Sequence, residues 1–226
     1  MPGPSNHNGQ SNPLVKYMSE LIDLTKGLDR EGTIVYIRNN RSVTGANAWL
    51  LLCSILIACV GLNLNSPAVI IGGMLISPLM SPILGVGLGV GINDRDLLLN
   101  SLYHFGISIV ISLMGSFLYF KLSPLVEMTE EIRARISPTL LDTFVAFFGG
   151  LAGIISISRK EVSNAIPGVA IATALMPPLC VSGYGMATDN FNVFINSFYL
   201  FFLNSFFIAV STFLMSRILD FPLRLY

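Results

Sequence analysis

The residues with the clearest potential for chemistry are polar and lie between prolines in otherwise apolar stretches. One such segment is Ser77-Pro78-Leu79-Met80-Ser81-Pro82, and another is Pro177-Pro178. Proline removes a backbone donor and clashes with the preceding turn, which costs about 3 kcal/mol or more inside a helix. In lipid the freed carbonyls find no water, so such breaks must face protein or a wet cavity. Two interpretations stay open: broken helices around a binding site, or kinks that only shape the packing.

Other polar side chains also fall inside or beside apolar stretches. His104 stands between Asn100 and Ser108 at steps of four, and a histidine in a membrane span is a functional candidate, although interhelical hydrogen bonding is an alternative. Asp142 is either a charge at an outer mouth or a first-turn residue that suits the helix dipole, with Ser137 or Thr139 as the cap. The predicted pathway residues are Asn65, Ser77, Pro78, Ser81, Pro82, His104, Asp142, Thr173, Pro177, Pro178 and Asn204.

The sequence lacks the usual signatures of enzymes and metal sites. It contains no HExxH or GxSxG motif and no His/Cys cluster with metal-ligand spacing, and it has two histidines in all. Its three cysteines, Cys53, Cys59 and Cys180, sit in apolar stretches and are expected to behave as small hydrophobic residues. We therefore expect a protein that is not an enzyme and that needs no cofactor and no metal.

The composition indicates an integral membrane protein. Hydrophobic residues make up 53% of the 226-residue chain and charged residues 12%, about half the share typical of soluble domains. The 13 basic and 13 acidic residues balance, so no basic excess suggests nucleic acid. We expect lipid as the surrounding partner.

The elements that must position the polar residues are six apolar spans. A spanning helix needs about 20 apolar residues, and the candidates are 46–64, 66–92, 97–120, 138–158, 165–187 and 191–217. Residues 1–13 are expected to form a disordered tail, and 14–45 a cytoplasmic amphipathic helix (14–28) and linker. The β-prone run 33–37 is compatible with a strand or with the linker. The spans divide into transmembrane repeats at 46–120 and 138–226, joined by an extracytoplasmic loop at 121–137.

The basic residues predict how the chain is oriented. Cytoplasmic loops carry an excess of Lys and Arg. Ten basic residues precede the first span, lie in the 2–3 and 4–5 loops or follow the last span, whereas three lie in the 3–4 loop. We therefore predict a multi-pass protein of the cell (inner) membrane with both termini in the cytoplasm.

The second and fifth spans resemble each other at an offset of 100 residues. Seven of 19 positions are identical, against about two by chance; the alternative is that Leu-, Ile- and Pro-rich helices merely look alike. Three helices per unit would make the repeat inverted, a design typical of transporters and some channels. The identical pairs are Pro67/Pro167, Val69/Val169, Ile71/Ile171, Leu75/Leu175, Pro78/Pro178, Leu79/Leu179 and Gly85/Gly185.

Three segments resemble the hydrophobic domain of unknown function 389 of bacteria and archaea. They are residues 65–83, which contain Ser77-Pro78-Leu79-Met80-Ser81-Pro82, residues 137–142 (Ser-Pro-Thr-Leu-Leu-Asp), and residues 166–179, which contain Pro177-Pro178. The resemblance covers about residues 46–217. It implies a prokaryotic cell-membrane protein and no established activity, and some members that the chain resembles carry a longer soluble N-terminal domain.

Two functions fit these features. The first is a channel or transporter for a small solute or ion, because paired midplane breaks in an inverted repeat are typical of transport proteins. The second is a non-transporting membrane scaffold or stress sensor. Helix faces of small residues, such as Gly73, Ser77, Ser81, Gly85 and Gly89 at steps of four, allow close helix packing. Because six spans leave little protein around a pathway, we expect a homo-oligomer in either case.

Overall fold

The computed structural model describes residues 27–124, 127–159 and 175–224. Within these ranges the regular structure is helical, and the sole β-type pairing is an isolated bridge between Leu28 and Arg159. The all-helical fold class is thus confirmed. In chain order the helices are α2 (Arg30–Asn40), α3 (Ala46–Asn63), α4 (Pro67–Ile76), α5 (Met80–Gly91), α6 (Arg95–Leu122), α7 (Glu130–Arg133), α8 (Leu140–Ile157), α10 (Met176–Ala187) and α11 (Phe191–Ile218).

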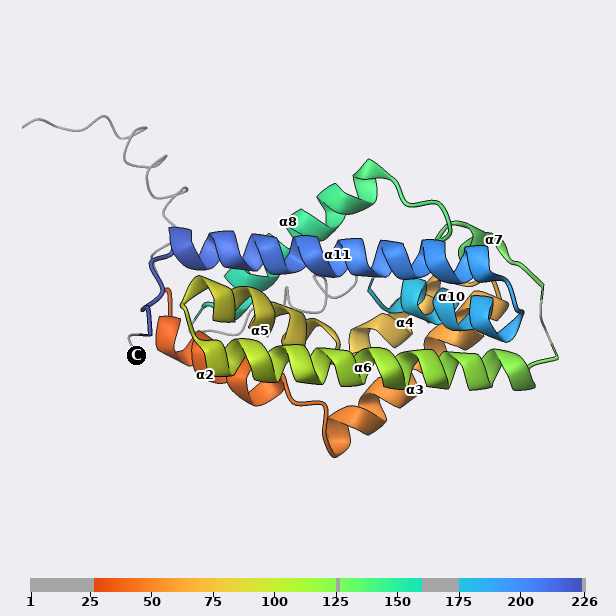
Figure 1. Ribbon diagram of the computed structural model, residues 1–226, viewed down its shortest axis with the longest axis horizontal. Coiled ribbons are helices and arrows are strands. Elements are labelled where there is room, and N and C mark those ends of the chain that lie inside the picture. The colour runs from red at the N-terminus through yellow and green to blue at the C-terminus, as the bar shows by residue number, and fades with distance from the viewer. Residues whose placement is uncertain (1–26, 125–126, 160–174, 225–226) are drawn as a thin grey trace, which may run out of the picture.

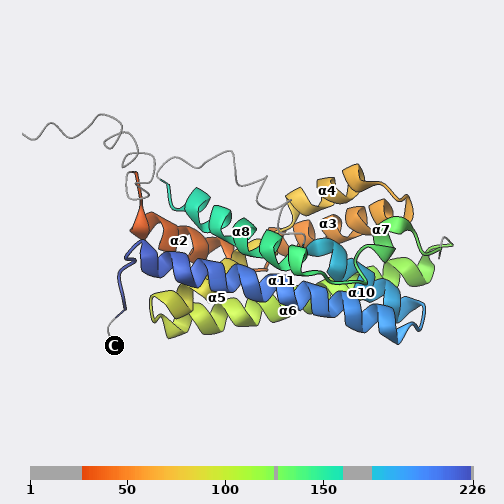
Figure 2. The same cartoon turned by 90° about the horizontal axis from the view of Figure 1, so that it is seen from above.

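Two long helices run the length of the molecule. Helices α6 and α11 have 28 residues each and lie in opposite directions along the long axis (Figure 1). The shorter α5 and α10 lie between them, α5 toward the end that carries α2 and α10 toward the other end (Figure 1). Helix α8 rises above α11 and α3 descends below α6 in that view, and the view from above places α8 along α11 (Figure 2).

Glycines let the short helices approach the long ones closely. A Cβ on Gly87 of α5 would lie against the Ala209 carbonyl oxygen and 2.7 Å from the Thr212 Cβ of α11. A Cβ on Gly183 of α10 would lie 2.6 Å from the Ser116 Cβ of α6. Real Cβ atoms do not come this close, so a side chain at either position would force these helices apart.

The tight hairpins end on Asn or Asp in the left-handed conformation, which these residues tolerate. Asn65 has φ +51°, Asn93 +56° and Asp189 +54°. In the second and third hairpins the amide of the next residue bonds back across the turn, from Asp94 to the Gly89 carbonyl and from Asn190 to the Gly185 carbonyl, each at 2.9 Å. The same local chemistry therefore joins α5 to α6 and α10 to α11.

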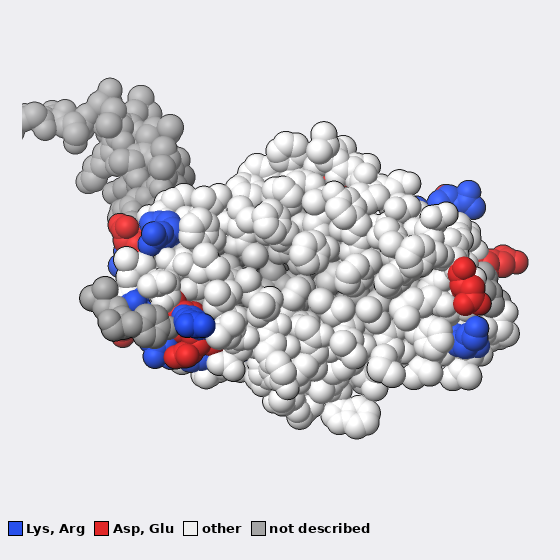
Figure 3. Space-filling view, in the orientation of Figure 1, with Lys and Arg blue, Asp and Glu red and all other residues white. Residues whose placement is uncertain are grey.

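Four described helices are long and apolar enough to span a membrane. They are α3, α6, α8 and α11, and the bent pair α4–α5 makes a fifth if it counts as one span. Charged side chains gather at the two ends of the long axis, leaving an uncharged face between them (Figure 3). The predicted spans at 46–64, 66–92, 97–120, 138–158 and 191–217 agree with these elements to within about two residues at most ends. Of the predicted span 165–187, residues 165–174 lie outside the described residues.

The segment before α3 is helical at its end. Residues 33–37, which the sequence left open between strand and linker, belong to α2, whose first turn is capped by the Asp29 carboxylate accepting from the Gly32 amide at 2.8 Å. A good cap outweighs the weak helix propensity of Thr, Ile and Val. The predicted helix at 14–28 and the tail at 1–13 lie outside the described residues, apart from residues 27 and 28.

A buried carboxylate ties three parts of the chain together at one end of the molecule. Asp94 is 1% exposed and caps α6 by accepting from the Leu97 amide at 2.9 Å. Its other partners are Arg38 of α2 at 2.7 Å and Arg224 of the C-terminal segment at 2.8 Å. Burial opposes ionisation of Asp94, but these partners outweigh it and hold the pKa of the carboxyl below its ordinary value. The network fixes α2 and the C-terminal segment onto the α5–α6 turn.

Replacing Asp94 with Asn should destabilise the protein by about 1–3 kcal/mol, the usual worth of hydrogen bonds to a charged group. The loss falls at the lower end because Arg38 and Arg224 are about half exposed and regain water. Since the folded-state pKa is lowered, the stabilisation is present above the unfolded-state pKa of about 3.9 and is lost as pH falls through the folded-state value. Thermal unfolding in detergent at neutral and acid pH measures both effects. Asp96→Asn is the matched control, because Asp96 is 69% exposed; equal losses in both variants would contradict the assignment.

Gly87→Ala should destabilise the protein by about 1–3 kcal/mol, because the added methyl overpacks the contact with α11. Gly106→Ala is the control, since a Cβ there meets nothing within 4 Å and alanine favours a helix by about 0.5–1 kcal/mol over glycine. Melting temperatures of the two variants in the same detergent test the contrast. The close approach would be disproved if Gly87→Ala melted at or above the temperature of Gly106→Ala.

Candidate functional site

The second span breaks where its serines and prolines predicted. Helix α4 ends at Ile76, α5 begins at Met80, and the two axes differ by 55°. Ser77 is extended, with φ −70° and ψ +126°. Its hydroxyl oxygen accepts from the Leu79 amide at 3.3 Å, so the side chain stabilises the break itself. This prediction of a proline-broken helix is confirmed.

At the start of α5, most of the backbone amides are already hydrogen-bonded or lack an N–H. The first four amide positions of a helix have no partner inside it, and here they belong to Leu79, Met80, Ser81 and Pro82. The Leu79 amide donates to Ser77, the Ser81 amide donates to the Pro78 carbonyl at 3.4 Å, and Pro82 has no N–H. Among the described residues, the Met80 amide is the one donor left at this helix start.

Helix α10 begins in a similar way. It starts at Met176, and the next two residues are Pro177 and Pro178, neither of which has an N–H. Both prolines are buried. The two prolines therefore stand at the beginning of the described half of the fifth span.

Asn204, at the middle of α11, lies level with the starts of both short helices. On the α10 side, the hydroxyls of Ser182 and Ser197 are 3.1 Å apart. Helices α10 and α11 are antiparallel. Moving seven residues, about two turns, from Ser182 toward the start of α10 and from Ser197 toward the end of α11 therefore brings Leu175 opposite Asn204. On the α5 side, Gly87 contacts Ala209 of α11, and Ile83 lines a cavity with Ser205 of α11. The first turn of α5, one turn before Ile83, therefore faces residues near 202 of α11.

The carboxamide of Asn204 is buried without satisfying its oxygen. The residue is 3% exposed, and its Oδ1 has no hydrogen-bond partner among the described residues. Because seven residues turn a helix through nearly two full circles, Asn204 lies on the same side of α11 as Ser197, which meets α10, and Ser211, which meets Gly150 of α8. Leaving a buried acceptor unpaired costs about 1–3 kcal/mol. An unpaired polar atom at this depth marks a place where a ligand would be stabilised.

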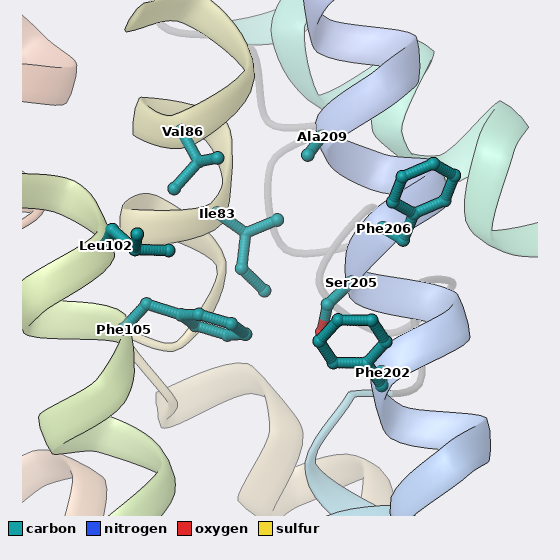
Figure 4. A pocket seen from close by; sticks show the side chains of 8 residues that line it. All are labelled: Ile83, Val86, Leu102, Phe105, Phe202, Ser205, Phe206 and Ala209. Carbon is teal, nitrogen blue, oxygen red and sulfur yellow. The ribbon is translucent and has the colours of Figure 1, made fainter. Parts of the chain in front are cut away.

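A cavity of about 140 Å³ lies beside the break, between α5, α6 and α11 (Figure 4). Ile83, Phe105 and Phe202 point into it, and Ser205 is the sole polar side chain among those that line it. The Ser205 hydroxyl donates to the Phe201 carbonyl at 2.8 Å. The cavity therefore suits an apolar group and cannot replace the water around a polar solute.

The other predicted residues lie away from the break or have structural partners. The Nδ1 atom of His104 accepts from the Val43 amide at 3.4 Å and so anchors the α2–α3 linker. Asn65 lies about 18 Å from Ser77, as measured by the rise of a helix over 12 residues. Its Oδ1 accepts from the Glu131 amide at 3.0 Å. Asp142 forms a capping box with Thr139 at the start of α8. Thr173 lies outside the described residues.

Comparison with known proteins identifies the family. The sequence model called Domain of unknown function (DUF389) matches residues 74–210. The chain belongs to the DUF389 family. This confirms the resemblance seen in the sequence, and the matched residues include the break, α6, α8, α10 and most of α11.

The DUF389 chain is also similar to an uncharacterized protein of Methanocaldococcus jannaschii. The two are 28% identical over 137 residues, which is 61% of this chain and 42% of the archaeal protein. The chain thus matches less than half of that relative's length. No solved structure is similar to it at a significant level.

Sequence reasoning missed two long-range features of this DUF389 structure, the pairing of Asp94 with Arg224 and the position of Ser108 opposite the start of α5. Asp94 could be assigned as a helix cap from its place after Asn93, but its partner Arg224 is 130 residues away. Ser108, at the middle of α6, was noted as part of a polar face with His104. Its alignment with the α5 start follows only from the contacts of Gly89 with Leu98 and of Gly85 with Ser101.

Proposed function

We propose that this DUF389 protein transports a small solute or ion across the cell membrane, through a pathway at the level of the two helix starts. The observation that carries the proposal is the pair of short helices, α5 and α10, that begin inside an apolar bundle and carry prolines in their first turns. Interrupted helices in the two halves of inverted repeats form the binding sites of many transporters.

Reciprocal contacts support an inverted repeat. Gly87 of α5 packs on Thr212 of α11, and Gly183 of α10 packs on Ser116 of α6. Each short helix thus reaches across to the long helix of the other half. The paired helices also have equal lengths: 12 residues in α5 and α10, 28 in α6 and α11, and 18 in α3 and α8.

The contacts favour a different offset from the one read in the sequence. Gly87 and Gly183 are 96 positions apart, and so are Ser116 and Thr212 and the turn residues Asp94 and Asn190. At this offset Ser108 corresponds to Asn204, whereas the offset of 100 paired Asn204 with His104. We take 96 as the better register for the second and third helices of each unit, because it pairs residues with the same contacts.

The proposed orientation follows the basic residues and places both termini in the cytoplasm. The Asp94 network, with Arg38 and Arg224, would then lie at the inner surface, and α7 at the outer one. We propose a homo-oligomer, because six spans in one chain leave little protein to enclose a water-filled path, and helix faces of small residues allow close packing with another copy. A non-transporting scaffold is the alternative that the flux test excludes or establishes.

Transport is tested with the double variant Ser77→Ala, Ser81→Ala in liposomes. If the break lies on the pathway, flux should fall by more than the melting temperature suggests, since two hydroxyls in packing roles are worth about 1 kcal/mol each at most. The measurement is solute or ion flux of purified protein, beside thermal unfolding of the same samples. Ser123→Ala, outside the break, is the control. Unchanged flux in the double variant would place the pathway elsewhere, and absence of flux in the unmodified protein would favour the scaffold.

Orientation is tested by cysteine labelling on a background without Cys53, Cys59 and Cys180. Glu130→Cys in α7 should react with an impermeant reagent from outside intact cells, because α7 belongs to the outer loop. Arg95→Cys at the start of α6 should react only after permeabilisation. Both positions are exposed. The reverse pattern would overturn the orientation.

A further inference from the structure

Among the described residues, the middle of the proposed pathway has more hydrogen-bond acceptors than donors. At the start of α5, one of four amide positions keeps an unused N–H, and prolines remove two of the four at the start of α10. A helix start normally attracts anions through these amides and the dipole. Without most of the amides, the two helix starts lose the groups that would hold an anion.

Three serines near this level present lone pairs rather than protons. A hydroxyl has one proton to donate. Ser108 donates it to the His104 carbonyl at 2.8 Å, Ser182 to the Pro178 carbonyl at 2.9 Å, and Ser205 to the Phe201 carbonyl at 2.8 Å. Each can therefore only accept from a ligand. Ser77, which accepts from Leu79, keeps its proton, and so does Ser112, whose hydroxyl has no partner among the described residues.

Positive charge is missing at the same depth. Helices α5 and α10 contain no Lys, Arg or His, α6 has none between His104 and Lys121, and the one basic residue of α11 is Arg217 in its last turn. An anion at this level would lose its water with no cation to offset the cost. A cation or an N–H-bearing solute would meet acceptor oxygens instead, as ions do in filters made of carbonyls.

We infer that the transported solute is a small cation or N–H donor and that the Oδ1 atom of Asn204 binds it. The oxygen is buried, has no partner among the described residues, and lies on the side of α11 that meets α10 and α8, at the level where α5 and α10 begin. Binding a donor there satisfies an acceptor that is otherwise left unpaired. This inference rests on the proposed transport function and names the class of solute.

The experiment measures flux of four probes into liposomes containing the full chain. Potassium carries charge without N–H, urea carries N–H without charge, ammonium has both, and nitrate is the anion. We expect flux of ammonium together with potassium or urea, and none of nitrate. Flux of nitrate alone would overturn the inference while transport itself stands. No flux of any probe would overturn the transport proposal and this inference with it.

Variants of Asn204 then test the residue. Asn204→Leu removes the acceptor at similar volume and should lower flux of the preferred probe about tenfold, the cost of one hydrogen bond to a charged or donor group. Asn196→Leu, on the exposed side of the same helix, should leave flux unchanged. If Asn204→Leu does not give monodisperse protein, Asn204→Asp serves instead, since it keeps the oxygens and should raise flux of potassium relative to urea. Equal flux in the Asn204 variant and the unmodified protein would overturn the assignment.

Discussion

A helix that begins inside an apolar bundle must either bond its first amide N–H groups to protein or lack them, because no water reaches them. The rest of the structure depends on this constraint. Each unsatisfied group costs several kcal/mol in lipid. Here the sequence removes the donors by placing prolines at the third position of α5 and at the second and third positions of α10. Ser77 and the Pro78 carbonyl take two of the remaining amides of α5. The breaks therefore leave few amide groups that need a capping water.

Short helices that start in the interior need neighbours that hold them in place. Glycines supply this by letting α5 and α10 approach α11 and α6 backbone to backbone. At the end of the bundle the restraint is electrostatic, because Asp94 joins α2, the α5–α6 turn and the C-terminal segment. Between these restraints the buried polar side chains are mostly serines and threonines. The Asn204 oxygen is one of a few buried polar atoms with no partner among the described residues, and it lies at the level of the two helix starts.

The sequence predicted the features that depend on local chemistry. Proline and serine at 77–82 located the break, the apolar runs located the four helices long enough to span a membrane and the bent pair α4–α5, and Thr139 was recognised as a possible cap of α8. Features that depend on distant residues could not be read in the same way. The pairing of Asp94 with Arg224 joins positions 130 residues apart, and the weak similarity of apolar helices gave an offset of 100 where the glycine contacts favour 96. His104 looked like a pathway residue because of its type, but its ring accepts a hydrogen bond from the Val43 amide of the α2–α3 linker.

The most direct test of this account is the depth of the two short helices in a bilayer. An electron cryo-microscopy map of the protein in lipid nanodiscs would show where α5 and α10 begin relative to the two headgroup layers. The account predicts that Met80 and Met176 both lie near the midplane, with Asp94 and Asp189 at opposite surfaces. A map in which either helix begins at a headgroup layer, or in which Asp94 and Asp189 share one surface, would contradict it.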